Sequence, residues 1–110
     1  MSDERRSQGR VEAYIEVLWE GASGKYEART ADIHTHGCFI DSIGEVAVGE
    51  TIRFKLQIPN SDWIDVKGVV VYKYPNAGFG VRFVSISPES DLKLLEWLVK
   101  AEVYRGQEKK

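Results

Sequence analysis

Hydrophobic and polar residues alternate over most of the chain, and this period of two is expected of β-strands that have one buried face. Over residues 11–20 the odd positions are apolar, whereas glutamates occupy three of the even positions. Residues 21–25 form a turn-prone Gly-Ala-Ser-Gly-Lys segment, and a second strand-like pattern runs over residues 26–33. These two runs predict a β-hairpin that leads into a polar bend at residues 34–37.

Further strands are predicted downstream of this hairpin. They cover residues 38–40, 52–58, 63–74 and 79–84, and the longest of them is rich in β-branched and aromatic residues. Pro-Asn-Ser-Asp at 59–62 and Pro-Asn-Ala-Gly at 75–78 supply turns between them. Gly68 lies inside the longest strand, where a glycine is typical of the bulge or bend that a closing barrel uses.

The end of the chain changes to a helical period. Ser87 can cap a helix and Pro88 suits the first helical position, and leucines recur after them at helical spacing. We therefore expect an all-β fold with one C-terminal helix: a six-stranded antiparallel β-barrel of Greek-key or meander topology, with the helix at about 88–104 over one opening. Barrel and helix form a single domain over 11–104, with a flexible basic N-terminal arm at 1–10 and a polar tail at 105–110.

Composition and charge narrow the function classes. The 110 residues are 43% hydrophobic and 29% charged, which is ordinary for one globular domain. The net charge of −2 argues against a general nucleic-acid-binding surface, and no apolar run approaches the roughly 20 residues of a membrane-spanning helix. The N-terminus shows no secretory signal, and Cys38 as the single cysteine fits a reducing compartment. We expect a cytoplasmic protein without membrane insertion.

Three short motifs carry the candidate chemistry. An Arg-x-x-x-Arg pattern occupies residues 6–10 directly before the first strand, with Arg5 ahead of it. Residues 32–37 read Asp-Ile-His-Thr-His-Gly at the bend after the second strand, and residues 78–83 read Gly-Phe-Gly-Val-Arg-Phe near the end of the barrel. In their order, spacing and predicted positions these motifs resemble the PilZ family, and the resemblance spans roughly residues 5–100.

The resemblance implies a PilZ-like split barrel that binds the bacterial second messenger cyclic di-GMP (c-di-GMP) and does no catalysis. Arg6 and Arg10 would contact guanine and phosphate, since an arginine fork pairs with the N7 and O6 acceptors of guanine and also with phosphate oxygens. Asp32 would accept hydrogen bonds from the donors on the opposite guanine edge. Gly37 would let the backbone approach closely or adopt a positive φ. His34 stands where the family carries a serine, and its imidazole could donate to phosphate, stack on a base or fill part of the site.

A basic arm that closes on a ligand also suggests how a signal would leave the domain. Ligand binding would order the N-terminal arm and change the surface that an unidentified downstream protein contacts. Arg5 could hold a second, stacked ligand molecule, because a guanidinium can lie on a base face or pair with a phosphate. The alternative is a PilZ-like protein-interaction module that has lost the ligand, since His34 replaces the serine of the motif.

A metal site or an enzyme is not expected. Four potential metal ligands occupy alternate positions, so a straight strand would project them from one face. They are Asp32, His34, His36 and Cys38. A bend is expected within this stretch, however, and side chains about 6–7 Å apart on one strand face suit two ligands to a zinc ion better than four. The hydroxyl side chains have no patterned base and orienting acid nearby, so no catalytic residue and no cofactor is assigned.

Overall fold

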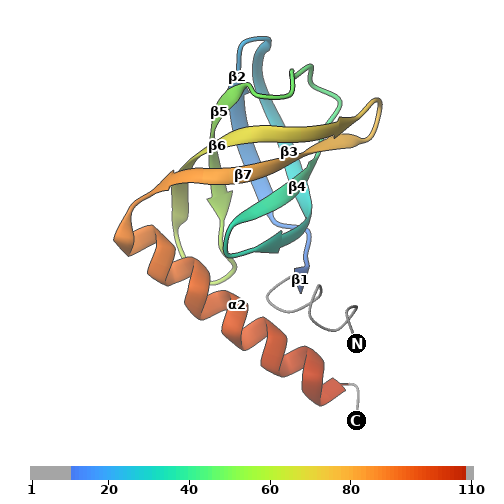
Figure 1. Ribbon diagram of the computed structural model, residues 1–110. Coiled ribbons are helices and arrows are strands. Elements are labelled where there is room, and N and C mark those ends of the chain that lie inside the picture. Colours follow the sequence, from blue (N-terminus) through green and yellow to red (C-terminus); the bar gives the residue numbers. More distant parts are fainter. Residues whose placement is uncertain (1–10, 109–110) are drawn as a thin grey trace.

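The computed structural model describes residues 11–108 of the chain. β-strands follow one another along the chain, and a helix comes last, as Figure 1 shows. The bounds are Val11–Glu12 (β1), Glu16–Gly21 (β2), Gly24–His34 (β3), Gly37–Asp41 (β4), Thr51–Gln57 (β5), Trp63–Tyr74 (β6), Gly78–Ile86 (β7) and Pro88–Glu108 (α2). The strands lie where hydrophobic and polar residues alternate in the sequence.

The sheet closes on itself. Neighbouring strands are antiparallel and follow the order β3, β2, β5, β6, β7, β4, and β4 pairs with β3 again. The short β1 pairs with the last part of β3. In Figure 1 this ring is a barrel with α2 at one end. The prediction of a six-stranded antiparallel barrel with one C-terminal helix is confirmed.

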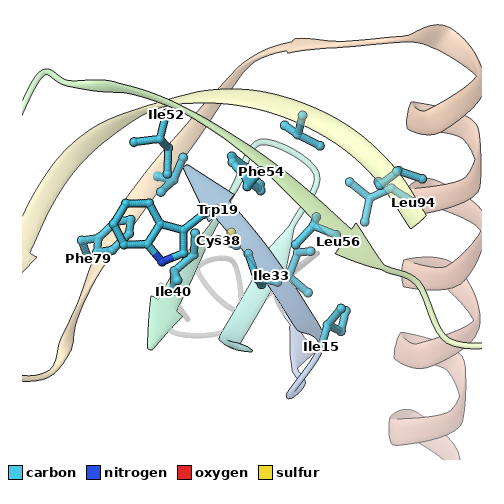
Figure 2. Close-up of a cluster of buried hydrophobic side chains, with 14 of the residues drawn as sticks. Ile15, Trp19, Ile33, Cys38, Ile40, Ile52, Phe54, Leu56, Phe79 and Leu94 are labelled. Carbon is cyan, nitrogen blue, oxygen red and sulfur yellow. The ribbon is translucent and has the colours of Figure 1, made fainter. Parts of the chain in front are cut away.

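Alternate residues of the strands fill the barrel interior, and Trp19 is the largest of the fully buried side chains. Its ring stacks on that of Tyr26 with 4.4 Å between the centroids, and it meets the Phe79 ring edge-on at 5.1 Å. The indole Nε1 donates to the hydroxyl of Ser42 at 3.1 Å. Figure 2 shows Trp19 among the aliphatic side chains of the core. These contacts give Trp19 a packing role.

The turns and the bulge lie where the sequence predicts them. Asn60 and Asn76 adopt positive φ angles of 62° and 65° in the turns before β6 and β7, a conformation that asparagine tolerates well. The register of β6 against β7 shifts between Lys67 and Gly68. The predicted irregularity at Gly68 is therefore confirmed.

The first strand differs from its prediction, because residues 11–20 do not form one continuous strand. They form β1 and β2, and residues 13–15 between them lie outside both strands. The register against β3 changes by one residue across the break, since Glu12 faces Asp32 whereas Glu16 faces Arg29. Such a break redirects a strand, as a bulge does.

The side chain of Thr30 bridges this break. Its hydroxyl donates to the carbonyl oxygen of Ala13 at 2.6 Å and accepts from the amide of Ile15 at 3.1 Å. Thr30 is fully buried, and it is the only buried polar residue in the described part of the chain. Because a buried polar group costs free energy unless it is hydrogen-bonded, these two bonds explain why a threonine is tolerated in the core.

The helix α2 begins as predicted. The hydroxyl of Ser87 accepts a hydrogen bond from the Ser90 amide at 3.1 Å, and Pro88 is the first helical residue. Leu94 and Leu98 are buried against the barrel core. The helix continues to Glu108, so residues 105–108 of the expected polar tail are helical. Within the described residues, no helix combines the length and apolar character that spanning a bilayer requires.

Replacing Thr30 with valine keeps the shape of the side chain and removes the hydroxyl that serves Ala13 and Ile15. The carbonyl and the amide then lose a buried partner, so we expect the free energy of unfolding to fall by about 1–3 kcal/mol. Denaturant unfolding followed by tryptophan fluorescence measures the change. Thr51→Val, at an exposed position of β5, is the matched control and should change stability by less than about 0.5 kcal/mol. Equal effects of the two substitutions contradict the role given to Thr30.

Candidate ligand-binding site

Three of the predicted site residues lie at one tight turn. β3 ends at His34 and β4 begins at Gly37, and these residues face each other across the turn. The amide of His36 donates to Nδ1 of His34 at 3.2 Å. Asp32 precedes the turn on β3 and faces Phe39 of β4. The fold therefore brings Asp32, His34 and Gly37 together, as the motif requires.

The hydrogen bond at His34 determines which ring nitrogen carries the proton. In a neutral imidazole one nitrogen donates and the other accepts, so acceptance at Nδ1 places the proton on Nε2. The side chain is half-buried at the end of β3. The proton on Nε2 thus belongs to the residue that stands where the PilZ motif has a serine.

Close backbone approach explains the glycines of the motifs. A Cβ atom on Gly37 would overlap the carbonyl oxygen of Val81 in β7. The sequence suggested two reasons for a glycine here, close backbone approach or a positive φ. Gly37 is not among the glycines with positive φ, so close approach is the reason. In the third motif, a Cβ on Gly78 would overlap a backbone carbonyl of β4, and one on Gly80 would overlap the ring of Tyr72. These positions allow β4, β7 and the side chains of β6 to lie unusually close.

The strand register extends the site from the turn across β4 to β7. Gly37 faces His34 on one side and Arg82 on the other. Facing residues of antiparallel strands project from the same face of a sheet, so His34 and Arg82 flank a position that has no side chain. Arg82 is exposed, and no ion pair holds its guanidinium among the residues that the structure describes.

A second row of facing residues lies beside the first and carries aromatic rings. It runs from Asp32 through Phe39 and Gly80 to Tyr72. The ring of Phe39 lies 6.2 Å from that of Tyr72 and 6.2 Å from that of Tyr74, and the two tyrosine rings are 5.5 Å apart. Tyr72 and Tyr74 are 43% and 60% exposed. We call Phe39, Tyr72 and Tyr74 the aromatic face.

Cys38 points away from this surface and into the core. Burial raises the pKa of its thiol far above the ordinary range, and the negative charge of Asp32 adds to the effect. The thiol is thus held in its protonated form, which is a poor metal ligand.

The alternate spacing of potential metal ligands does not produce a cluster, because the turn divides them. The ring centroids of His34 and His36 lie 6.3 Å apart. Within residues 11–108, no three His, Cys, Asp or Glu side chains form a group that could hold a metal ion. The alternate spacing therefore has no structural support as a metal site.

The structure reaches only part of the predicted site. Arg5, Arg6 and Arg10 lie outside the described residues. Conversely, sequence reasoning did not assign the aromatic face or Arg82 to the site. Arg82 was visible as part of the third motif, but its position beside Gly37 depends on the pairing of β4 with β7.

Two hollows lie elsewhere on the barrel. A groove of about 900 Å³ is lined mainly by β2, β3, β5, β6 and the start of α2. Its lining includes basic and acidic side chains, and some of them face each other across strands: Glu20 faces Arg53, and Lys55 faces Asp65. A second hollow of about 640 Å³ lies between the β3–β4 turn, β7 and α2. Neither of these two hollows contains Asp32, His34 or Gly37.

Solved structures share this fold at low sequence identity. The inhibitor of motility MotI/DgrA of Bacillus subtilis matches with a TM-score of 0.77 at 15% identity, over 86% of this chain and 50% of that chain. YcgR of Escherichia coli in complex with c-di-GMP matches with a TM-score of 0.73 at 13% identity, over 90% and 46%. The PilZ domain of CeSA from a cellulose-synthesizing bacterium matches at 0.63 and 11% identity, over 84% and 97%. This chain spans about half the length of the first two proteins.

Family membership follows from the sequence itself. No curated protein matches the chain. The family described as PilZ domain, however, matches residues 4–101, which is most of the chain. The match includes the β3–β4 turn and the strand that carries the third motif, and the closed barrel is the fold of the solved PilZ structures. The chain belongs to the PilZ domain family.

Proposed function

We propose that this chain is a receptor domain for cyclic di-GMP that signals to a partner protein. The observation that carries the proposal is the β3–β4 turn, where Asp32, His34 and Gly37 lie together in a chain of the PilZ family. The fold is shared with YcgR of Escherichia coli, which was solved in complex with c-di-GMP. The nucleotide lies on the open face formed by β3, β4 and β7.

The row that contains Asp32 suits a guanine base. The carboxylate of Asp32 accepts hydrogen bonds from N1 and N2 of guanine, which are donors that adenine lacks. Phe39 faces Asp32 on the neighbouring strand, and its ring continues into the aromatic face. A base held by the carboxylate therefore lies within reach of an aromatic ring, and such stacking contributes roughly 1–3 kcal/mol per base.

The position of β1 supports a role for the arm arginines. Val11 faces Ile33, and Glu12 faces Asp32. Arg10 directly precedes Val11 in the sequence, and Arg6 lies four residues before Arg10. Consecutive Cα atoms lie about 3.8 Å apart, so an arm that starts at β1 starts beside the site. Arg6 and Arg10 close on the guanine and phosphate groups from that side.

The same arrangement supplies a route for the signal. β1, which the arm directly precedes in the sequence, lies in contact with α2. Ligand binding orders the arm, and the changed surface of arm and helix is what a downstream protein reads. MotI/DgrA of Bacillus subtilis is named as an inhibitor of motility, an example of a relative in fold that acts on another process.

A second candidate function follows from His34. The imidazole is much larger than the serine hydroxyl of the motif, and it occupies the end of β3 beside the candidate site. If this ring fills the site, the chain is a module that contacts a partner protein without binding the nucleotide. Isothermal titration calorimetry with cyclic di-GMP separates the two, because the ligand-free module releases no binding heat.

Arg6→Ala and Arg10→Ala should each weaken cyclic di-GMP binding by about ten- to a hundredfold, since a hydrogen bond to a charged group contributes about 1.5–3 kcal/mol. Calorimetric titration measures the affinity, and thermal unfolding shows that the domain remains folded. Arg53→Ala on β5 is the matched control and should bind like the parent. Wild-type affinity in both arm variants contradicts the proposed site.

The same titrations test Arg5, because a stoichiometry of one nucleotide per chain argues against a second, stacked ligand.

Asp32→Ala should weaken binding and reduce the preference for guanine over adenine cyclic dinucleotides, because the carboxylate is the acceptor that distinguishes them. Competition of cyclic di-AMP against labelled cyclic di-GMP measures this preference. Asp41→Ala, at an exposed position of β4, is the control for loss of one negative charge. An unchanged preference in Asp32→Ala removes Asp32 from base recognition.

A further inference from the structure

We propose that Tyr72 and Tyr74 hold the second base of the cyclic dinucleotide by stacking, and that the site does not read the identity of this base. The inference rests on the proposed function, in which the arm arginines and Asp32 read the two edges of one guanine. It extends the ligand class to cyclic dinucleotides that carry one guanine and one other purine.

Both tyrosines of the aromatic face present their rings to solvent. Tyr72 and Tyr74 are 43% and 60% exposed, and their ring centroids lie 5.5 Å apart. Each centroid lies 6.2 Å from that of Phe39, and the ring of Tyr72 is inclined by only 25° to the ring of Phe39. Stacking requires an exposed ring and no enclosed cavity. The tyrosines therefore offer a surface for a base next to the one that Asp32 holds.

Glycines of β7 determine where these rings lie. Gly80 faces Tyr72, and a Cβ on Gly80 would overlap the ring of Tyr72. A Cβ on Gly78 would lie 2.8 Å from Cε2 of Phe39. The rings of Tyr72 and Phe39 thus reach over β7 into space that side chains on this strand would otherwise fill.

This arrangement brings the ring of Tyr72 close enough to Asp32 for one ligand to contact both. The row of facing residues runs from Asp32 on β3 through Phe39 to Gly80, and neighbouring strands lie about 4.8 Å apart. A ring over Gly80 is therefore about 10 Å from β3. The two bases of a cyclic dinucleotide are joined through sugars and phosphodiesters on both sides, so they lie on neighbouring parts of the same face.

The surroundings of the two tyrosines do not supply the acceptor that distinguishes guanine from adenine. Guanine N1 and N2 are donors, and a carboxylate is the side chain that accepts from them. On β7 the tyrosines face glycines, and Lys73 between them donates to the carbonyl oxygen of Val46 at 3.1 Å. Asp41 faces Gly78 on one side, but on the other side it faces Arg29. Apart from Asp32, the described residues of these rows thus offer no carboxylate without a facing cation, and stacking alone accepts any base.

Calorimetric titration of the full chain with three cyclic dinucleotides tests the tolerance for the second base. The mixed ligand with one guanine and one adenine should bind within about threefold of cyclic di-GMP, because only one of its two orientations places guanine at Asp32. Cyclic di-AMP should bind about a hundredfold more weakly, since neither of its bases has the donors that Asp32 accepts. A mixed ligand that binds as weakly as cyclic di-AMP overturns the inference and leaves the receptor function standing. A folded parent chain that releases no heat with any of the three overturns both proposals.

Tyr72→Leu and Tyr74→Leu should each weaken binding of cyclic di-GMP and of the mixed ligand alike, by about five- to a hundredfold, because a stacked ring is lost. Tyr72→Phe and Tyr74→Phe keep the ring without the hydroxyl and should bind within about threefold of the parent. Trp63→Leu is the matched control, since Trp63 is an exposed aromatic residue at the opposite end of β6 and should not alter the affinity. Thermal unfolding shows that each variant remains folded.

The variants distinguish ring stacking from other contacts. Loss of affinity in the leucine variants with affinity retained in the phenylalanine variants supports stacking. Unchanged affinity in both leucine variants overturns it, and equal loss in the leucine and phenylalanine variants overturns it in favour of a hydrogen bond from the hydroxyl. Equal loss in Trp63→Leu overturns it as well, because the effect is then not specific to the aromatic face. The ligand series uses the parent chain, so it decides the inference even if a leucine variant fails to fold.

Discussion

Closure of the barrel depends on one strand that pairs with different partners along its length. The first part of β3 pairs with β2, and the part from Arg29 onward pairs with β4. At the changeover the β4 register has an irregularity between Thr30 and Asp32, and the opposite edge has the break between β1 and β2. The hydroxyl of Thr30 satisfies the backbone there. Without these two bonds the bend would leave buried polar groups unpaired, which is more costly than a missing contact between apolar groups.

The same bend positions the candidate site. Because β3 bends at Thr30, its last residues pair with β4 and end at the turn, and β4 in turn pairs with β7. Glycines at 37, 78 and 80 allow these strands and the ring of Tyr72 to approach closely. The ring of Phe39 occupies the space beside Gly78, and the ring of Tyr72 occupies the space beside Gly80. The glycines of the family motifs are thus requirements of close packing.

The sequence indicates the strands, turns and helix start because each depends on local chemistry. Alternation marks the strands, Asn60 and Asn76 mark turns, and Ser87 with Pro88 marks the helix start. The break after Glu12 could not be predicted in this way, because every odd position of residues 11–20 is apolar and the hydroxyl that bridges the break comes from Thr30 on another strand. The aromatic face and Arg82 depend on registers between strands distant in sequence, which a local pattern does not contain.

Charge explains why the arm and the barrel face would act together. The chain carries a net charge of −2, so its overall field does not attract an anionic nucleotide, and exposed charges are screened beyond about 10 Å. Under the proposed function, several arginines of like charge would converge on one ligand, which costs free energy through their mutual repulsion. A cyclic dinucleotide carries two phosphodiesters, whose negative charges would offset that repulsion. Under the proposed function, the ligand is therefore the counter-ion that docks the arm onto the barrel, and because β1 touches α2, docking alters the surface beside the helix.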